Sequence, residues 1–221
     1  MFEPLQMSES ASTNTSPLAS TPLIQGAAAV PSAIAQDMAK LKTLLREGIG
    51  GQVTPGAEMR ILNLACGRCD EAETLVSVGQ ELSGGNAVEM IGADIRIREI
   101  RQAREQHGHL PAKFLIEDAT KISQHKELGD DFNLVFLRHQ NFWHGQEVWK
   151  KIFDQGIAKL RPDGCLVITS YFDVEHRLAL DALKALGMEV VSNQRNRASR
   201  ALADAPGKSV DRWVAVLRRK A

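Results

Sequence analysis

The sequence predicts an α/β fold: a single three-layer αβα domain around a mainly parallel seven-stranded sheet with an antiparallel last strand. Two observations predict it. From residue 60 to about residue 187, short apolar stretches alternate with longer stretches whose apolar residues recur at helical spacing. The chain then continues with two apolar stretches, 188–192 and 212–217, joined by a loop without helical pattern. Strands connected through helices run parallel, so only this final pair is expected to be antiparallel.

The composition agrees with one globular domain. The 221 residues are 43% hydrophobic and 24% charged, which is enough apolar material for a sizeable core. The formal net charge of +0 argues against a general attraction to nucleic acid or anionic membranes. No apolar run approaches the roughly 20 residues of a membrane span, and no signal-peptide pattern is visible. Three cysteines would leave one unpaired in a disulfide framework, so we expect a cytoplasmic protein without membrane contact.

The chain divides into three predicted segments. Residues 1–31 are rich in Ser, Thr, Ala and Pro without periodicity, so we expect a disordered tail. Residues 32–57 are expected to form a helix and a glycine-rich linker that starts near Gly48. The apolar positions of this helix are Ile34, Met38, Leu41 and Leu45. The helix could cover a ligand site as a lid or pack on the sheet, and residues 58–221 would form the α/β domain.

The stretch 60–76, RILNLACGRCDEAETLV, predicts a buried strand, a tight turn and a helix. Gly67 has no Cβ, so a ligand can approach the backbone of the turn closely. Asp70 and Glu73 have the spacing of a capping box at the helix start. A turn of this kind is a ligand site in open α/β sheets. Acidic residues there disfavour a pyrophosphate and favour a small, partly cationic nucleoside.

Acidic residues also follow the next two predicted strands. Strand 88–93 is followed by Asp94, and strand 113–116 is followed by Glu117 and Asp118. A carboxylate at the first position can accept both hydroxyls of a ribose, and one at the second can accept an adenine amino group. Either acid could instead cap the helix that follows it.

The predicted strand 132–137 ends in the densest group of polar and aromatic residues in the chain, 138–144 with the sequence RHQNFWH. Ligands bind at the carboxyl ends of strands in this architecture, so we expect this loop to form part of a site. Loop histidines and tryptophans often only pack, which is the alternative interpretation.

The remaining pattern predicts, in order, a helix at 148–160, a turn at 161–164, a strand at 165–170 and a helix at 174–186. Tyr171 and Phe172 follow that strand and could line a substrate pocket or pack in the core. The loop between the last two strands is basic, with Arg195, Arg197, Arg200 and Lys208. It could contact an acidic substrate or be a mobile exposed loop.

Five short motifs together resemble those of the Rossmann-like (class I) S-adenosylmethionine-dependent methyltransferases, over residues 58–218. They are 63–69 (NLACGRC), 92–95 (GADI), 117–119 (EDA), 131–136 (DFNLVF) and 160–166 (LRPDGCL). The first stands where the family has an acid followed by alternate glycines. The resemblance implies the family's fold and S-adenosylmethionine as the cofactor.

The resemblance also implies roles for individual residues. The expected cofactor contacts are Asn63, Ala65, Cys66, Gly67, Asp94, Ile95, Asp118, Ala119 and Arg138. Among these, Asp94 would hold the ribose and Asp118 the adenine. His139 is the candidate catalytic base, because it lies in the loop after the fourth strand. The expected substrate pocket is formed by Gln140, Asn141, Trp143, Tyr171 and Phe172, and no metal site is expected.

Three functions stay open. The first is methyl transfer to an unidentified acceptor, with a small molecule favoured over a protein or RNA. The second is a non-catalytic binding or scaffold protein of the same fold, because Asn63, Ala65 and Cys69 replace the family's acid and two glycines. The third is a thioredoxin-like redox protein, because Cys66 and Cys69 form a CxxC motif between a strand and a helix. The oligomeric state is not predicted.

Overall fold

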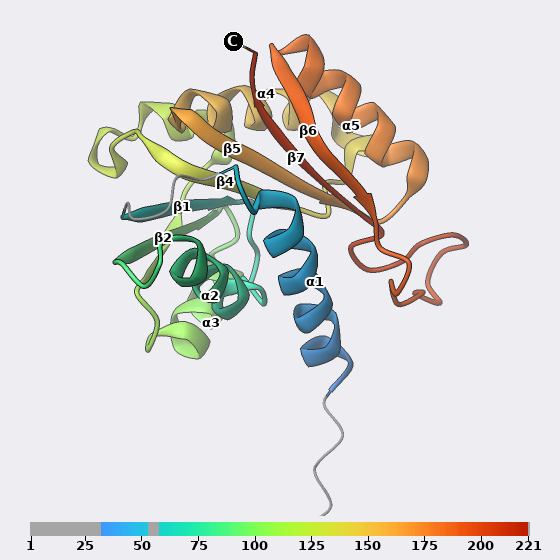
Figure 1. The fold of residues 1–221 in the computed structure, drawn as a ribbon, viewed down its shortest axis with the longest axis horizontal. Helices are drawn as coiled ribbons and strands as arrows, with labels where there is room; N and C mark the ends of the chain where they lie inside the picture. Colours follow the sequence, from blue (N-terminus) through green and yellow to red (C-terminus); the bar gives the residue numbers. More distant parts are fainter. Residues whose placement is uncertain (1–31, 53–57, 221) are drawn as a thin grey trace, which may run out of the picture. The chain divides into compact units, whose positions relative to one another are not determined.

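A seven-stranded sheet forms the centre of the described residues, 32–52 and 58–220, in the computed structural model (Figure 1). The strands are β1 (Met59–Leu64), β2 (Val88–Asp94), β3 (Ala112–Ile116), β4 (Phe132–Arg138), β5 (Leu160–Ser170), β6 (Met188–Arg195) and β7 (Trp213–Arg219). Their spatial order is β3-β2-β1-β4-β5-β7-β6. Strands β1 to β5 pair in parallel, whereas β7 is antiparallel to both of its neighbours. The predicted fold class is confirmed.

Helices cover both faces of the sheet. They are α1 (Ala33–Ile49), α2 (Ala72–Leu82), α3 (Ile97–His107), α4 (Phe142–Lys159), α5 (Asp173–Ala185) and the short 3-10 helices η1 (Ala119–Gln124) and η2 (Lys126–Leu128). Apolar residues of α1, α2 and α3 share one buried cluster, and those of α4, α5 and η1 share another. The three layers follow from this division. The predicted tail at 1–31 and the linker residues 53–57 lie outside the described residues.

Alternation of side chains along the central strands separates the two clusters. Ile61 and Leu134 face α1 to α3, whereas Leu62 and Val135 face α4 and α5. Each fully buried aliphatic side chain contributes about 1.5–3 kcal/mol, so a shift of one residue in register would be strongly unfavourable. The fixed register places Asn63 beside Gly92 of β2 and Phe136 of β4. The carboxyl ends of β1, β2 and β4 therefore meet at one edge of the sheet.

Helix α1 packs on the sheet and is not a lid. The Ser32 hydroxyl caps it by accepting a hydrogen bond from the Ala35 backbone N–H at 3.2 Å. Leu41, Leu45 and Ile49 are fully buried in the cluster with α2 and β7. This packing, rather than the lid, is the alternative that the structure supports.

The predicted capping box at the start of α2 is wrong. The N-cap residue is Glu71, and its side chain makes no capping hydrogen bond. The Asp70 carboxylate instead accepts from Arg68 at 3.1 Å. The Glu71 carboxylate accepts a hydrogen bond from the guanidinium of Arg138 instead of from the backbone N–H groups at the start of α2. A charged donor forms the stronger hydrogen bond.

Two later boundaries also differ from the prediction. Helix α4 begins at Phe142, ahead of the predicted start at residue 148, with a non-helical backbone at Gly145 (φ −149°, ψ 36°). The Glu175 carboxylate accepts the Phe142 backbone N–H at 2.8 Å and so satisfies this helix end. Strand β5 begins at Leu160, because the predicted turn at 161–164 is absorbed into an irregular pairing with β4.

Candidate functional site

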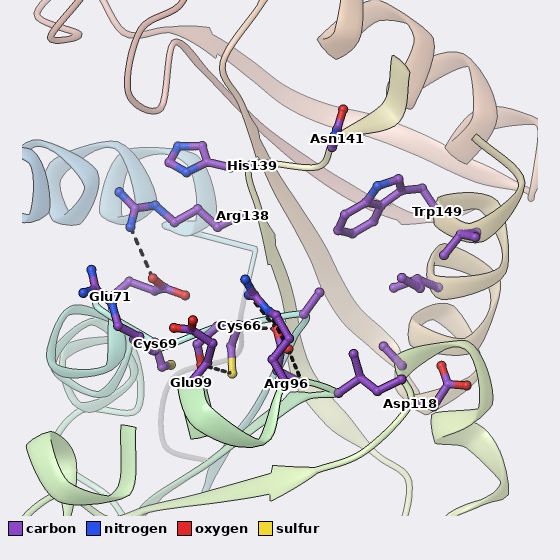
Figure 2. A pocket seen from close by; sticks show the side chains of 18 of the residues that line it. Cys66, Cys69, Glu71, Arg96, Glu99, Asp118, Arg138, His139, Asn141 and Trp149 are labelled. Carbon is purple, nitrogen blue, oxygen red and sulfur yellow. Dashed lines mark hydrogen bonds and ion pairs between the residues drawn. The ribbon is translucent and has the colours of Figure 1, made fainter. Parts of the chain in front are cut away.

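A cavity of about 630 Å³ opens where β1, β2 and β4 end (Figure 2). Three segments line it, namely 65–71, 94–96 and 118–120, together with Glu99, Arg138, His139, Asn141, Val148, Trp149, Ile152 and Tyr171. Its size is in the range of small-molecule and cofactor sites. Parallel strands bring their carboxyl ends to one edge, which is why segments so distant in sequence meet here.

The turn after β1 has the backbone of a glycine-rich turn although it holds one glycine. Ala65, Gly67 and Cys69 all have positive φ angles, of 53°, 57° and 55°. For residues with a Cβ, this conformation costs about 1–2 kcal/mol each. The Cys69 backbone N–H donates to the Cys66 carbonyl at 2.8 Å and closes the turn. The surrounding structure therefore holds two non-glycine residues in a glycine conformation.

Asp94 lies at the end of β2 with its carboxylate in the cavity. It accepts the backbone N–H groups of Gly67 and Arg96, both at 2.8 Å, and the Arg96 guanidinium at 3.0 and 3.1 Å. Burial alone would raise the pKa of Asp94, but the hydrogen bonds from Arg96 and Gly67 outweigh it and lower this pKa. Asp94 is therefore ionised at neutral pH, and each of its oxygens accepts two hydrogen bonds.

Arg96 covers the same turn. A Cβ added to Gly67 would lie 2.8 Å from the Arg96 Nη2 atom, so the guanidinium occupies the open space above this glycine. The Arg96 side chain is itself 59% exposed, and it can leave without disturbing the core. A ligand that uses Asp94 must displace this arginine.

Asp118 caps η1, which is the structural alternative considered for it. Its Oδ1 atom accepts the Thr120 backbone N–H at 2.9 Å and the Thr120 hydroxyl at 2.7 Å. Asp118 and Ala119 nevertheless line the cavity, beside the exposed side chain of Ile95. The other carboxylate oxygen of Asp118, Oδ2, lies 3.9 Å from the Lys121 ammonium, which is too far for a hydrogen bond. Asp118 can therefore cap η1 with one oxygen and contact a ligand with the other.

A buried polar network lies behind the turn. Figure 2 shows Arg138 pointing toward Glu71, with 3.2 Å between its Nη1 atom and the carboxylate. On its other side Arg138 donates to both oxygens of Asp211, at 3.0 and 2.7 Å. Asn63 donates to Glu71 at 2.6 Å and to the Cys69 sulfur at 3.2 Å. Asn63 is fully buried and does not line the cavity, so it acts on the site through Glu71.

The network carries a net negative charge. Burial alone would lower the pKa of Arg138, but Asp211 and Glu71 outweigh it and raise this pKa further above its usual value. Burial alone would raise the pKa of Asp211, but Arg138 and His139 hold it well below its usual value. Two carboxylates and one guanidinium leave one excess negative charge in this network, of which Glu71 and Arg138 line the cavity, and such an environment favours a cationic ligand.

His139 lies at the point where the network meets the cavity. It has a positive φ of 58°, and its ring stacks on Tyr171 with 3.7 Å between centroids. Its Nε2 atom lies 2.9 Å from Asp211 Oδ1 and 3.1 Å from the Asp211 backbone nitrogen. These neighbours favour opposite tautomers, and the full charge of the carboxylate places the proton on Nε2. Burial lowers the pKa of His139 despite Asp211, so the imidazole is neutral at pH 7 with Nδ1 as the basic nitrogen.

A second, smaller cavity of about 480 Å³ adjoins the first, which is the larger of these two. The two cavities share His139, Asn141 and Tyr171 as walls. The second one adds Gln140, Trp143, His144, Phe172, Glu175 and Lys208. All the predicted substrate-pocket residues therefore lie around it, although Gln140 is fully buried and donates to the Leu137 carbonyl at 2.6 Å.

The CxxC pair does not have the properties of a redox site. Both cysteines belong to the lining of the larger cavity, but Cys69 is fully buried and Cys66 is only partly exposed. A hydrogen bond to Cys66 and burial raise the pKa of the Cys69 thiol well above its usual value. Because a thiolate is the reactive form, this environment argues against thioredoxin-like chemistry.

No protein-family model matches the sequence, and none of the curated proteins is significantly similar to it. Solved structures are similar in fold. An S-adenosylmethionine-dependent methyltransferase from Clostridium acetobutylicum has a TM-score of 0.62 at 10% identity, covering 83% of this chain and 92% of its own. The N-methyltransferase NodS from Bradyrhizobium japonicum has a TM-score of 0.58 at 14% identity, covering 84% and 98%. A ribosomal protein L11 methylase from Lactobacillus delbrueckii has a TM-score of 0.55 at 15% identity, covering 83% and 79%.

The chain has the class I methyltransferase fold. The similarity covers 83–84% of the chain, and the mainly parallel sheet agrees with the topology that the sequence resemblance implied. In the methyltransferase fold, the larger cavity occupies the crevice at the carboxyl edge of the sheet. None of the helices in the described part of the chain is long and apolar enough to cross a membrane. Within residues 32–52 and 58–220, no cluster of His, Cys, Asp and Glu could hold a metal ion.

Sequence reasoning missed three residues of this site, Glu71, Arg96 and Asp211, and it named Lys208 only as part of the basic loop. Glu71 and Arg96 lie close to motif residues in the sequence. A charged residue beside the turn or beside Asp94 could therefore have been predicted to belong to the site. Asp211 and Lys208 lie in the loop before β7, and no pattern in the sequence connects that loop with β4.

Proposed function

We propose that this protein binds S-adenosylmethionine in the larger cavity and catalyses transfer of its methyl group to a small-molecule acceptor in the smaller cavity. The observation that carries the proposal is the pair of adjoining cavities at the carboxyl edge of a methyltransferase-like sheet, with His139 and Tyr171 in their common wall. When bound, S-adenosylmethionine supplies a methyl group on a positively charged sulfur.

The residues around the larger cavity fit this cofactor. Asp94 is an ionised acceptor for the ribose hydroxyls, and Ile95, which is 66% exposed, offers an apolar surface for the adenine. The turn at Gly67 allows a close approach once Arg96 moves. Asn63 has no charge, but Glu71 contributes the carboxylate that the motif lacks, so the wall remains complementary to a cation.

His139 is assigned the role of base. Its Nδ1 atom has no hydrogen-bond partner among the described residues, and Asp211 fixes the ring on the Nε2 side. A neutral imidazole held in this way can accept the proton of an acceptor O–H or N–H group. Trp143 and Phe172, whose rings meet edge to face at 6.5 Å, form apolar walls that exclude water from the acceptor.

Calorimetry with S-adenosylmethionine and S-adenosylhomocysteine tests the binding step. Transfer is tested with radiolabelled methyl groups and a panel of phenols, amines, carboxylates, nucleosides, peptides and RNA. We expect binding of both ligands and labelling of a small molecule. The absence of binding would refute the proposal. Binding without transfer to any member of the panel would favour the non-catalytic alternative, for which the specific support is the replacement of the motif's acid and two glycines by Asn63, Ala65 and Cys69.

Arg96→Ala is expected to tighten binding of S-adenosylmethionine about fivefold. The guanidinium is half-exposed, so its ion pair with Asp94 contributes at most about 1 kcal/mol, and the ligand must break this pair. Calorimetry on the variant measures the change, with Arg101→Gln on the exposed face of α3 as the control. Weaker binding by Arg96→Ala would show that Arg96 holds the ligand instead of competing with it.

His139→Gln is expected to lower kcat about a hundredfold at pH 7 and to leave cofactor affinity nearly unchanged. The pKa of His139 is lowered from 6.5, so the wild-type base form persists below that pH. The kcat/KM of the wild-type protein should therefore fall only below about pH 6.5, and the variant should lack this decline. His109→Gln, on the surface, is the control. Unchanged turnover by His139→Gln would remove the residue as the base.

A further inference from the structure

A third hollow, of about 810 Å³, lies within the loop that joins β6 to β7, shown in orange-red in Figure 1. Four cationic side chains line it: Arg195, Arg197, Lys208 and Arg212. No Asp or Glu is present among the described residues of its lining. Because the chain as a whole has a formal net charge of +0, this is a local concentration of positive charge.

Two of the four cations are neutralised by acids outside the hollow. Lys208 lies 2.6 Å from an Asp204 carboxylate oxygen, and Arg212 lies 2.6 Å from Asp173. These pairs fix the two side chains in place.

The other two cations make no ion pair within the described residues, although Arg195 also contributes to the lowered pKa of Asp173. The Arg195 guanidinium lies over the Trp213 ring, 5.9 Å from its centroid, and Arg197 makes no ion pair within the described part of the chain. Guanidinium groups bind carboxylates and phosphates through paired N–H donors, so the hollow has the chemistry of an anion site.

Hydrogen bonds hold the loop against the rest of the domain. Arg200 donates to the buried Asp37 of α1 at 2.6 and 2.9 Å. The Ser209 backbone N–H donates to the Tyr171 carbonyl at 3.2 Å, and the Ser199 hydroxyl donates to the Val210 carbonyl at 2.6 Å. Because these contacts already order the loop, binding of a ligand there does not have to offset the entropy of ordering a flexible segment.

Lys208 connects this hollow with the smaller cavity. It lines both, and its ammonium lies 4.7 Å from the centroid of the Tyr171 ring. The larger cavity, the smaller cavity and the basic hollow are therefore adjacent, with Tyr171 in the first shared wall and Lys208 in the second.

We infer that the methyl acceptor is a small molecule with a carboxylate or phosphate group, and that Arg195 and Arg197 bind this anionic end in the hollow while its nucleophilic end lies beside His139. This inference rests on the proposed function. The volumes of 480 and 810 Å³ suit a small molecule, whereas a nucleic acid would need a basic surface that extends beyond one loop.

The binding site itself is tested without cofactor or turnover. Inorganic pyrophosphate is titrated calorimetrically into the full-length protein at low salt, with an expected dissociation constant of about 1 mM or tighter. Arg195→Gln and Arg197→Gln should each weaken binding about tenfold, because each loses a charged donor to the anion. Arg101→Gln removes the same charge from α3 and should have no effect. Absent binding, or equal weakening by the control, would overturn the inference.

Two further measurements separate the inference from the proposed function. Calorimetry with S-adenosylmethionine reports on the proposed function and should be unaffected by Arg197→Gln. In transfer assays, acceptors compared in pairs, such as hydroxybenzoate with phenol or a nucleoside 5′-phosphate with its nucleoside, should favour the anionic member at least tenfold in kcat/KM. Arg197→Gln should abolish this preference. If the arginine variants weaken binding of a single-stranded RNA oligonucleotide and leave pyrophosphate unaffected, the small-molecule acceptor is refuted.

Discussion

Asp94→Asn is expected to weaken S-adenosylmethionine binding about a hundredfold. Hydrogen bonds to an ionised acceptor contribute about 1.5–3 kcal/mol each, and the substitution removes the charge from an acceptor for two ribose hydroxyls. The low pKa of Asp94 means that the wild-type carboxylate is fully ionised across the neutral range. Calorimetry at pH 7.5 measures the change.

Several controls make this result interpretable. Asp154→Asn changes an exposed carboxylate on α4 and should leave affinity unchanged. Thermal unfolding of Asp94→Asn checks that the turn at Gly67 survives the loss of one hydrogen-bond partner. If a folded Asp94→Asn protein binds the cofactor as tightly as the wild type, the ribose contact is elsewhere and the proposed placement is refuted.

Arg138→Met is expected to lower the free energy of unfolding by about 3–5 kcal/mol. Arg138 is the cation between two carboxylates, of which Glu71 is 3% exposed and Asp211 is 1% exposed. Its removal leaves both buried without a counter-charge. Since total stability is typically about 5–15 kcal/mol, the variant should be marginal at 37 °C. Urea unfolding at 25 °C measures the difference, and Arg46→Met, which breaks an exposed pair with Glu81, should cost less than about 1 kcal/mol.

The loss of stability expected for Arg138→Met depends on pH. In the wild type the pKa of Asp211 is lowered, so its contribution to stability is present above the unfolded-state value and is lost as the pH falls below about 4. In Arg138→Met, burial without the cation raises the pKa of Asp211, and protonation of this carboxylate relieves the penalty. The stability difference between variant and wild type should therefore narrow from pH 8 to pH 5.5. Adding Asp211→Asn to the variant should recover part of the loss. A constant difference would contradict this electrostatic account.

The fold could be predicted because its signals are local. Strands and helices alternate in a pattern that each window of ten or so residues reveals, and Gly67 and Asp94 directly follow strands. The antiparallel end of the sheet was readable because the final connection has no helical pattern. The boundaries that failed depend on distant partners. The start of α4 is satisfied by Glu175, which is 33 positions from Phe142, and no local pattern reports it.

The predicted site was incomplete for the same reason. Arg138 is separated from Glu71 by 67 positions and from Asp211 by 73, so the buried network exists only after the sheet has formed. The capping box failed because its local preference was weaker than the attraction of Glu71 to a buried guanidinium. From the sequence, Asn63 appeared to leave the motif without a negative charge. The carboxylate of Glu71 supplies that charge, and its hydrogen bond with Asn63 depends on the conformation of the turn.

The position of β7 has a consequence for how the protein is made. This strand is the last of the seven to be synthesised, yet it lies between β5 and β6 in the sheet. Asp211 precedes the first residue of β7 by two positions. During translation, Arg138 and His139 therefore emerge from the ribosome long before their carboxylate partner. Until that partner is synthesised, the buried network around Arg138 is incomplete, and the site can form only after β7 has joined the sheet.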